Sequence, residues 1–222
     1  MSEIEVCQLA YNGQFELLRQ KINANKNLAT KKDQSNRMPL HWSVSAGHKD
    51  ISEYLLNLGV PVDESDDSEW TPLHIAASAG RYDIVVALLG RGAKVNAVNQ
   101  TGQVPLHYAA SRDRIDITEL LLDHGADPNR FDKLSATPLH RAASKGNYKI
   151  IDLLIKNNAE VEAVDCEGNT PIHLACEENR TDEAKLLLEH GASLYTLNKE
   201  EKSPLDLAPA GLRKTLERLN QG

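Results

Sequence analysis

The chain has 222 residues, of which 41% are apolar and 26% are charged, with a net charge of −7 and a pI near 5.6. Binding of duplex nucleic acid needs a basic surface, so this charge excludes nucleic acid as the main partner. No run of 18 uncharged apolar residues is present, which excludes a membrane-spanning helix. The first residues, MSEIEVCQLAYNG, carry acids where a signal peptide needs basic and then apolar residues, which predicts a protein of the cytoplasm and nucleus.

Cysteine usage gives no sign of a metal site or a disulfide framework. Cys7, Cys166 and Cys176 are odd in number and far apart, and none belongs to a C-x-x-C pair. Zinc sites and disulfide-rich folds both need closely spaced cysteines. We therefore expect three free thiols.

A proline recurs every 33 residues along most of the chain. The surrounding segments, such as TPLHIAASAG (71–80) and TPLHRAASKG (137–146), share a T-P-L-H-x-A core. A 33-residue period with this core is the signature of the ankyrin repeat. A degenerate unit without proline or histidine, VCQLAYNGQFELLRQKI, precedes the first of them. The six prolines are Pro39, Pro72, Pro105, Pro138, Pro171 and Pro204.

Residues 71–103 show how one repeat is built. Thr71 is suited to cap a first helix, Pro72 to its first position, where the missing N–H is no loss, and Gly80 to its end. A second helix, YDIVVALLG, is apolar at helical spacing, and Gly92 fits a left-handed cap after it. AKVNAVNQTGQ then leads to the next repeat as a turn-forming finger. The left-handed slot is filled in other repeats by Gly59, Gly125, Asn158 and Gly191.

Stacking of such units predicts an all-α fold, an elongated and curved ankyrin-repeat solenoid of seven helix-turn-helix repeats with β-hairpin fingers. We expect a single domain over 1–222. Its terminal repeats should differ from the others because each has one face in water. The last repeat has Asp206 in place of histidine, Pro209 inside its helical region, and a stripe of Leu212, Leu216 and Leu219. The repeat boundaries are 1–37, 38–70, 71–103, 104–136, 137–169, 170–202 and 203–222.

Five of the eight histidines occupy the signature slot, one in each central repeat. Neighbouring rings should then lie about 10 Å apart, the packing distance of helices, and cannot share a zinc ion. We predict that each ring binds loop backbone between repeats. The chain also lacks the G-x-x-x-x-G-K-[ST] and G-x-S-x-G motifs. We therefore predict no enzyme activity, no cofactor and no metal. The five are His41, His74, His107, His140 and His173, and the remaining three, at 48, 124 and 190, should be exposed.

Positions whose residue type varies between repeats are less constrained by the fold, so they are candidates for binding a partner. They fall in the finger tips, directly after the histidine, and in the pair of residues that ends the first helix. Fingers and first helices line the concave side of an ankyrin stack, so we predict one protein-binding groove. Its residues are Arg37, Trp42, Asp66, Asp67, Trp70, Ile75, Ser78, Tyr108, Arg112, Arg141 and Lys145.

The chemistry of this groove is uneven. The chain's two tryptophans, Trp42 and Trp70, both occupy varying positions, and Trp beside Arg is a favoured interface anchor. The alternative is that each packs between helices. Acidic residues at 63–70, basic residues at 112–145 and acidic residues at 167–178 alternate along the groove. This pattern indicates a partner with a complementary mixed charge pattern.

The segments at 9–48, at 70–85 and at 167–195 (EGNTPIHLACEENRTDEAKLLLEHGASLY) go beyond a generic ankyrin repeat. With them the chain resembles the gankyrin family of proteasome regulatory proteins. This resemblance implies an assembly chaperone, expected to be a monomer, whose groove holds the C-terminal domain of a proteasomal ATPase subunit. It implies that Arg37 and Arg112 pair with partner acids and Asp67 with partner arginines. Trp42, Trp70 and Ile75 would supply the apolar contacts.

The resemblance also implies a second activity, binding of the retinoblastoma protein through an L-x-C-x-E motif. The motif is present as Leu174, Cys176 and Glu178. These residues fall in the signature helix, whereas such a ligand binds extended, so its use would require local unfolding. Members of the family also bind cyclin-dependent kinase. A cell-cycle regulator acting on either protein, and a generic ankyrin scaffold, are therefore the alternatives to the assembly chaperone.

Overall fold

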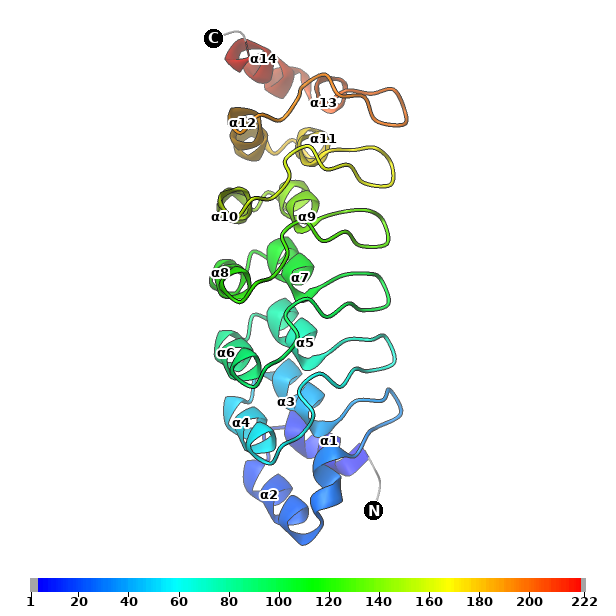
Figure 1. Ribbon diagram of the computed structural model, residues 1–222, viewed down its shortest axis with the longest axis vertical. Coiled ribbons are helices and arrows are strands. Elements are labelled where there is room, and N and C mark those ends of the chain that lie inside the picture. Colours follow the sequence, from blue (N-terminus) through cyan, green and yellow to red (C-terminus); the bar gives the residue numbers. More distant parts are fainter. Residues whose placement is uncertain (1–3, 221–222) are drawn as a thin grey trace. The chain divides into compact units, whose positions relative to one another are not determined.

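The computed structural model describes residues 4–220, and all regular secondary structure in this range is helical. The chain forms two compact units, Met1–Gln100 and Thr101–Gly222. In each unit the first helices of the repeats stack in one row and the second helices in another, with the fingers extending beside the first helices (Figure 1). No helix among the described residues is long and apolar enough to cross a membrane.

The unit Met1–Gln100 holds the first three helix pairs. In the row of first helices α1 packs on α3 and α3 on α5, and in the row of second helices α4 packs on α6. Leu18, Ile22, Leu40 and Ile51 have no solvent exposure and form part of its core. The helices are α1 (Ile4–Tyr11), α2 (Phe15–Ala24), α3 (Pro39–Ala46), α4 (Lys49–Asn57), α5 (Pro72–Ala79) and α6 (Tyr82–Gly90), with a 3-10 helix at Lys26–Thr30.

The unit Thr101–Gly222 repeats this plan. Its first helices pack in the order α7, α9, α11 and α13, and its second helices in the order α8, α10, α12 and α14. Leu106, Leu121, Leu139 and Ile150 are fully buried. The helices are α7 (Pro105–Ser111), α8 (Ile115–Asp123), α9 (Pro138–Lys145), α10 (Tyr148–Lys156), α11 (Pro171–Glu177), α12 (Thr181–Glu189), α13 (Pro204–Leu207) and α14 (Ala210–Leu219).

The signals that begin and end the helices act as predicted. Thr71 precedes α5, Pro72 is its first residue, and Gly80 closes it at φ 73°. The slot after each second helix is left-handed in every repeat where it was predicted, including Asn158 at φ 65°. At Gly146 glycine is needed for a second reason, since an added Cβ would lie 2.9 Å from Cδ of Arg180.

In fingers 33–37, 66–70, 132–136, 165–169 and 198–202 the turn is built by a side chain at the first residue. In finger 66–70, Oδ1 of Asp66 accepts the backbone N–H groups of Ser68 and Trp70, and Asp66 N–H donates to Trp70 O. Asp33, Asp132, Asp165 and Asn198 do the same in their own fingers. The predicted β-hairpins are therefore tight turns, because no strand occurs among residues 4–220. The fingers are 33–37, 66–70, 99–103, 132–136, 165–169 and 198–202.

Four signature histidines bind the backbone of the loop that follows their helix, as predicted. In His107, Nδ1 accepts the N–H of Val104, so Nε2 carries the proton and donates to Ala136 O of finger 132–136 at 3.1 Å. His140 and His173 make the equivalent pair of bonds to their next fingers. In His41, Nδ1 accepts the N–H of Met38 and Nε2 bonds Glu64 O, two residues before finger 66–70. Burial lowers the pKa of all four rings, that of His41 to about 4. The rings are therefore neutral and structural.

Three expectations need correction. Pro209 does not lie inside a helix: α13 ends at Leu207, and Pro209 directly precedes α14, because proline suits a helix start and not its interior. In the leucine stripe of α14, Leu212 and Leu216 are buried, but Leu219 is 45% exposed at the frayed end. His48 is not fully exposed, because its Nε2 bonds Tyr11 O at 2.9 Å.

Candidate functional site

Each unit has a candidate site, the surface formed by its own fingers and first helices, here called the finger face. In the unit Met1–Gln100 its centre is Trp42, which follows the signature histidine of α3. The indole N–H donates to Asp33 Oδ2 at 2.8 Å. The guanidinium carbon of Arg37 lies 5.2 Å from the ring centroid, and the ring of Tyr11 meets it edge-on at 5.7 Å. Trp42 is thus half-buried in a polar cluster and does not belong to the core between helices.

Arg37 is already paired within the chain. Its Nε and Nη2 lie 2.9 and 2.8 Å from Oδ2 of Asp66 on the next finger. Asp66 is only 6% exposed, because its other oxygen holds the turn of its own finger. Asp66 therefore shapes the finger and positions Arg37, and it presents little surface to a partner.

The rest of this unit's finger face combines exposed and buried residues. Asp67 is exposed at the finger tip, and Trp70 is half-buried with its ring centroid 6.0 Å from that of His74. Ile75 and Ser78 are each 7% exposed. They form the floor below the finger and offer a partner little surface. Arg37, Trp42, Asp67 and Trp70 therefore carry most of the accessible chemistry.

In the unit Thr101–Gly222, Tyr108 and Arg112 belong to α7 and its end, and Arg141 and Lys145 belong to α9. Tyr108 is half-buried, and Arg112 and Lys145 are exposed. Arg141 pairs with Asp132 nine residues before it, as Trp42 does with Asp33. In both cases the residue after the signature histidine donates its side chain to the aspartate that begins the preceding finger.

A pocket of about 330 Å³ lies between fingers 132–136 and 165–169. Its wall includes Arg141 and Lys145, which the sequence predicted as site residues. It also includes Leu134 and Asp165, which the sequence analysis missed. Asp165 lies at the 33-residue interval of the finger acids, so the repeat alignment contained the signal for it.

The L-x-C-x-E residues lie in and directly after α11, as expected. Leu174 is half-buried, Cys176 has no exposure, and Glu178 follows the last helical residue and is exposed. Burial raises the pKa of the Cys176 thiol to about 12. An extended ligand cannot form here without unfolding α11.

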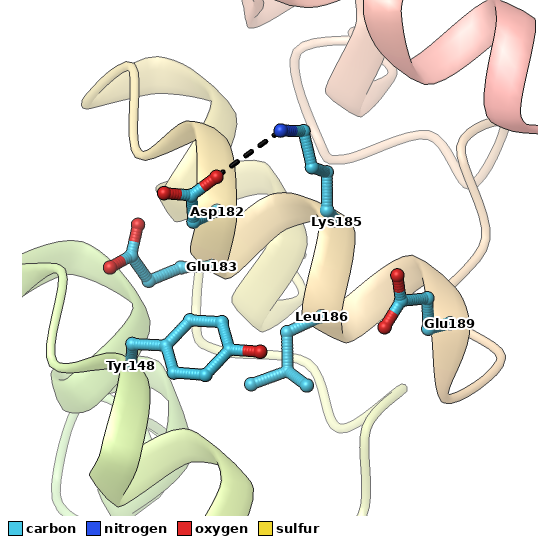
Figure 2. A pocket seen from close by; sticks show the side chains of 6 residues that line it. All are labelled: Tyr148, Asp182, Glu183, Lys185, Leu186 and Glu189. Atoms are coloured by element: carbon cyan, nitrogen blue, oxygen red, sulfur yellow. Dashed lines mark hydrogen bonds and ion pairs between the residues drawn. The ribbon is translucent and has the colours of Figure 1, made fainter.

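A second depression, of about 400 Å³, lies on the row of second helices, where the sequence analysis placed no site. Figure 2 shows Tyr148 of α10 beside Leu186 of α12, with the carboxylates of Asp182, Glu183 and Glu189 around them. Asp182 is paired with Lys185 at 3.2 Å. Among the described residues no group of three or more His, Cys, Asp and Glu side chains is placed to hold a metal ion.

The fold and these faces define a repeat protein built for contact with other proteins. A family model for ankyrin repeats in three copies matches residues 6–99 and 88–165, and a second ankyrin-repeat model matches residues 158–208. The chain belongs to the ankyrin-repeat family.

A more particular likeness is to the protein named 26S proteasome non-ATPase regulatory subunit 10. Over 66 residues the chain is 56% identical to this protein from Homo sapiens, and 55% identical to those from Rattus norvegicus and Mus musculus. The aligned segment covers 30% of this chain and 29% of each relative. The likeness is consistent with a gankyrin-like ankyrin-repeat protein.

Proposed function

We propose that the chain is an assembly chaperone of the 26S proteasome base that holds the C-terminal domain of an ATPase subunit on its finger face. The observation that carries the proposal is the likeness to the proteasome's non-ATPase regulatory subunit 10. That name gives the relatives a place in the proteasome, and the ATPase partner is the further step proposed here. Such a protein acts by binding, so we propose no enzyme activity and no cofactor, and a location in cytoplasm and nucleus.

The finger face supports a protein partner. Trp42 and Trp70 present half-buried aromatic surface, and Arg37 lies over Trp42. Tryptophan and arginine are the residues that most often dominate the energy of protein interfaces. Asp67 is exposed on the finger face of the unit Met1–Gln100 and fits a basic position of a partner. Arg112 and Lys145 are exposed on that of the unit Thr101–Gly222 and fit acidic positions.

The test is an affinity purification of the full chain from cells of its own source. The ATPase subunits of the base should co-purify without the mature 20S core, because a chaperone leaves before the particle is complete. Co-purification of intact 26S particles, or of no ATPase subunit, would overturn the proposal. Trp70→Ala is the variant to run beside it, and Val86→Ala, an exposed position on α6, is its control.

The cell-cycle alternative has a separate test. Binding of the retinoblastoma protein through Leu174, Cys176 and Glu178 needs α11 to unfold, since Cys176 is fully buried. A purified assay of cyclin-dependent kinase with the full chain added tests the kinase branch. Inhibition at equimolar chain would favour a cell-cycle regulator, and unchanged kinase activity would favour the assembly chaperone.

A further inference from the structure

The pocket between fingers 132–136 and 165–169 differs from its counterparts in how its finger acid is satisfied. In the other fingers that begin with aspartate, the oxygen that does not hold the turn accepts a bond from a neighbouring side chain. Asp33 Oδ2 accepts from Trp42, and Asp66 Oδ2 accepts from Arg37. Asp132 Oδ2 accepts from both Arg141 and Gln103. The donors come from two slots, one 9 residues after the acid and one 29 residues before it.

At Asp165 both donor slots hold apolar residues. The slot 9 residues later is Leu174, and the slot 29 residues earlier is Ala136. Oδ1 of Asp165 accepts the N–H groups of Glu167 and Asn169 at 2.9 and 2.8 Å, as in the other fingers. Oδ2 has no hydrogen-bond partner within residues 4–220. Asp165 is half-buried and lines the pocket, so a charged oxygen is left for a donor from outside the chain.

The part of the pocket lined by α9 is basic. Arg141 uses one guanidinium nitrogen for Asp132, and its Nε is buried without a partner among residues 4–220. Lys145 is exposed one helical turn further along α9 and makes no ion pair there. Leu134, 56% exposed, and Leu174 add apolar surface to the wall. The pocket thus offers an acid site, a base site and an apolar surface.

We propose that this pocket is a subsite of the proposed ATPase-binding surface and recognises the direction in which a segment of the partner runs. The inference rests on the proposed function. The pocket receives a segment of the partner domain that carries a basic side chain for Asp165 and an acidic one for Arg141 and Lys145. An apolar side chain of the same segment packs on Leu134 and Leu174. Because the acid belongs to finger 165–169 and the bases belong to α9, a segment that enters in the reverse direction meets like charges at both. The subsite therefore selects one orientation of the partner.

The experiment titrates the full chain calorimetrically with the C-terminal domain of each proteasomal ATPase subunit. Asp165→Asn is the main variant, because asparagine can hold a finger turn. In finger 198–202, Oδ1 of Asn198 accepts the backbone N–H groups of Glu200 and Lys202 at 3.0 Å each. Glu160→Gln, at an exposed acid that does not line the pocket, is the control with the same charge change. Gln103 donates a side-chain hydrogen bond to Asp132, and residue 136 holds the equivalent position for Asp165. Ala136→Gln should therefore satisfy the free oxygen of Asp165 with a donor from the chain itself.

Asp165→Asn and Ala136→Gln should each weaken binding about 5-fold, and Lys145→Gln similarly, without lowering Tm. Glu160→Gln should bind within about 2-fold of the unaltered chain. Equal affinity of all these variants and the unaltered chain would overturn the subsite and leave the proposed function standing. No binding of any ATPase domain by the unaltered chain would overturn both.

Discussion

Arg37 and Asp66 form an ion pair between consecutive fingers, with Nη2 and Oδ2 2.8 Å apart, and the same guanidinium lies over Trp42. The carboxylate side chain is 4% exposed and that of Arg37 is 30% exposed. The pair therefore holds two fingers at a fixed spacing and keeps a tryptophan ring at the surface.

Loss of the Arg37 charge should destabilise this unit. Arg37→Gln leaves the nearly buried Asp66 carboxylate without its cation, so the free energy of unfolding should fall by about 1 to 2 kcal/mol. Urea unfolding followed by tryptophan fluorescence measures it. Arg19→Gln is the control, because Arg19 and Glu16 are 4.0 Å apart and mostly exposed. A loss no larger than that of Arg19→Gln would contradict the role given to the pair.

Gly146→Ala should be more harmful than Gly125→Ala. Both glycines are left-handed, at φ 76° and 83°, so both substitutions share a backbone penalty of about 1 kcal/mol. Only at Gly146 does the new methyl meet a neighbour, Cδ of Arg180 at 2.9 Å, while nothing lies within 4 Å at Gly125. Arg180 Nε also donates to Ser144 O, so its displacement loses a bond between repeats. Thermal unfolding of the two variants should show the lower Tm for Gly146→Ala, and equal values would contradict the steric argument.

Stability should fall as pH decreases from about 6.5 to 4. His41, His107, His140 and His173 are neutral in the fold, and burial lowers the pKa of each, that of His41 from 6.5 to about 4. In this window the unfolded chain binds more protons than the folded chain, so protonation favours unfolding. His41 alone accounts for about 3 kcal/mol. Urea midpoints measured across this range test it. A variant of exposed His124 should keep the slope, and a flat profile from pH 6.5 to 4 would count against neutral buried rings.

Only one thiol should react in the folded chain. Cys166 is exposed at a finger tip, whereas Cys7 and Cys176 are buried and burial raises the pKa of each to about 12. A thiol reagent at pH 8 should modify one cysteine per chain natively and three in urea, because the thiolate is the reactive form. Peptide mass mapping identifies the site. Rapid native labelling of Cys176 would show that α11 opens and would revive the L-x-C-x-E hypothesis.

The regular features of the fold follow directly from the period of the sequence. Pro72, Gly92 and His107 each recur at 33 residues because each performs one local task in every repeat, so the repeats, their caps and the histidine bonds were predictable. The fingers were misjudged as β-hairpins because the side chain of an acid such as Asp66 replaces the strand pairing. Pro209 was misplaced because the last repeat departs from the repeat pattern.

The candidate site was less accessible to sequence reasoning. Variation between repeats predicted Trp42, Trp70, Arg141 and Asp66 as site residues, but it did not predict that Asp66 is paired with Arg37. Arg37 pairs with Asp66, which lies 29 residues later in the next finger. Only the three-dimensional packing of the repeats shows that these two side chains are in contact. Asp165 was missed for the same reason. It differs from the other finger acids because Ala136 and Leu174, at the two positions that supply donors elsewhere, have no side-chain donor.

The most direct test of the account is calorimetric titration of the full chain with the isolated C-terminal domain of each proteasomal ATPase subunit. One domain should bind with 1:1 stoichiometry. Trp70→Ala should weaken that binding at least about 10-fold, and Asp67→Asn about 3-fold, with folding unchanged. Absence of binding to every domain, or undiminished binding by Trp70→Ala, would contradict the finger face as the site that holds the ATPase.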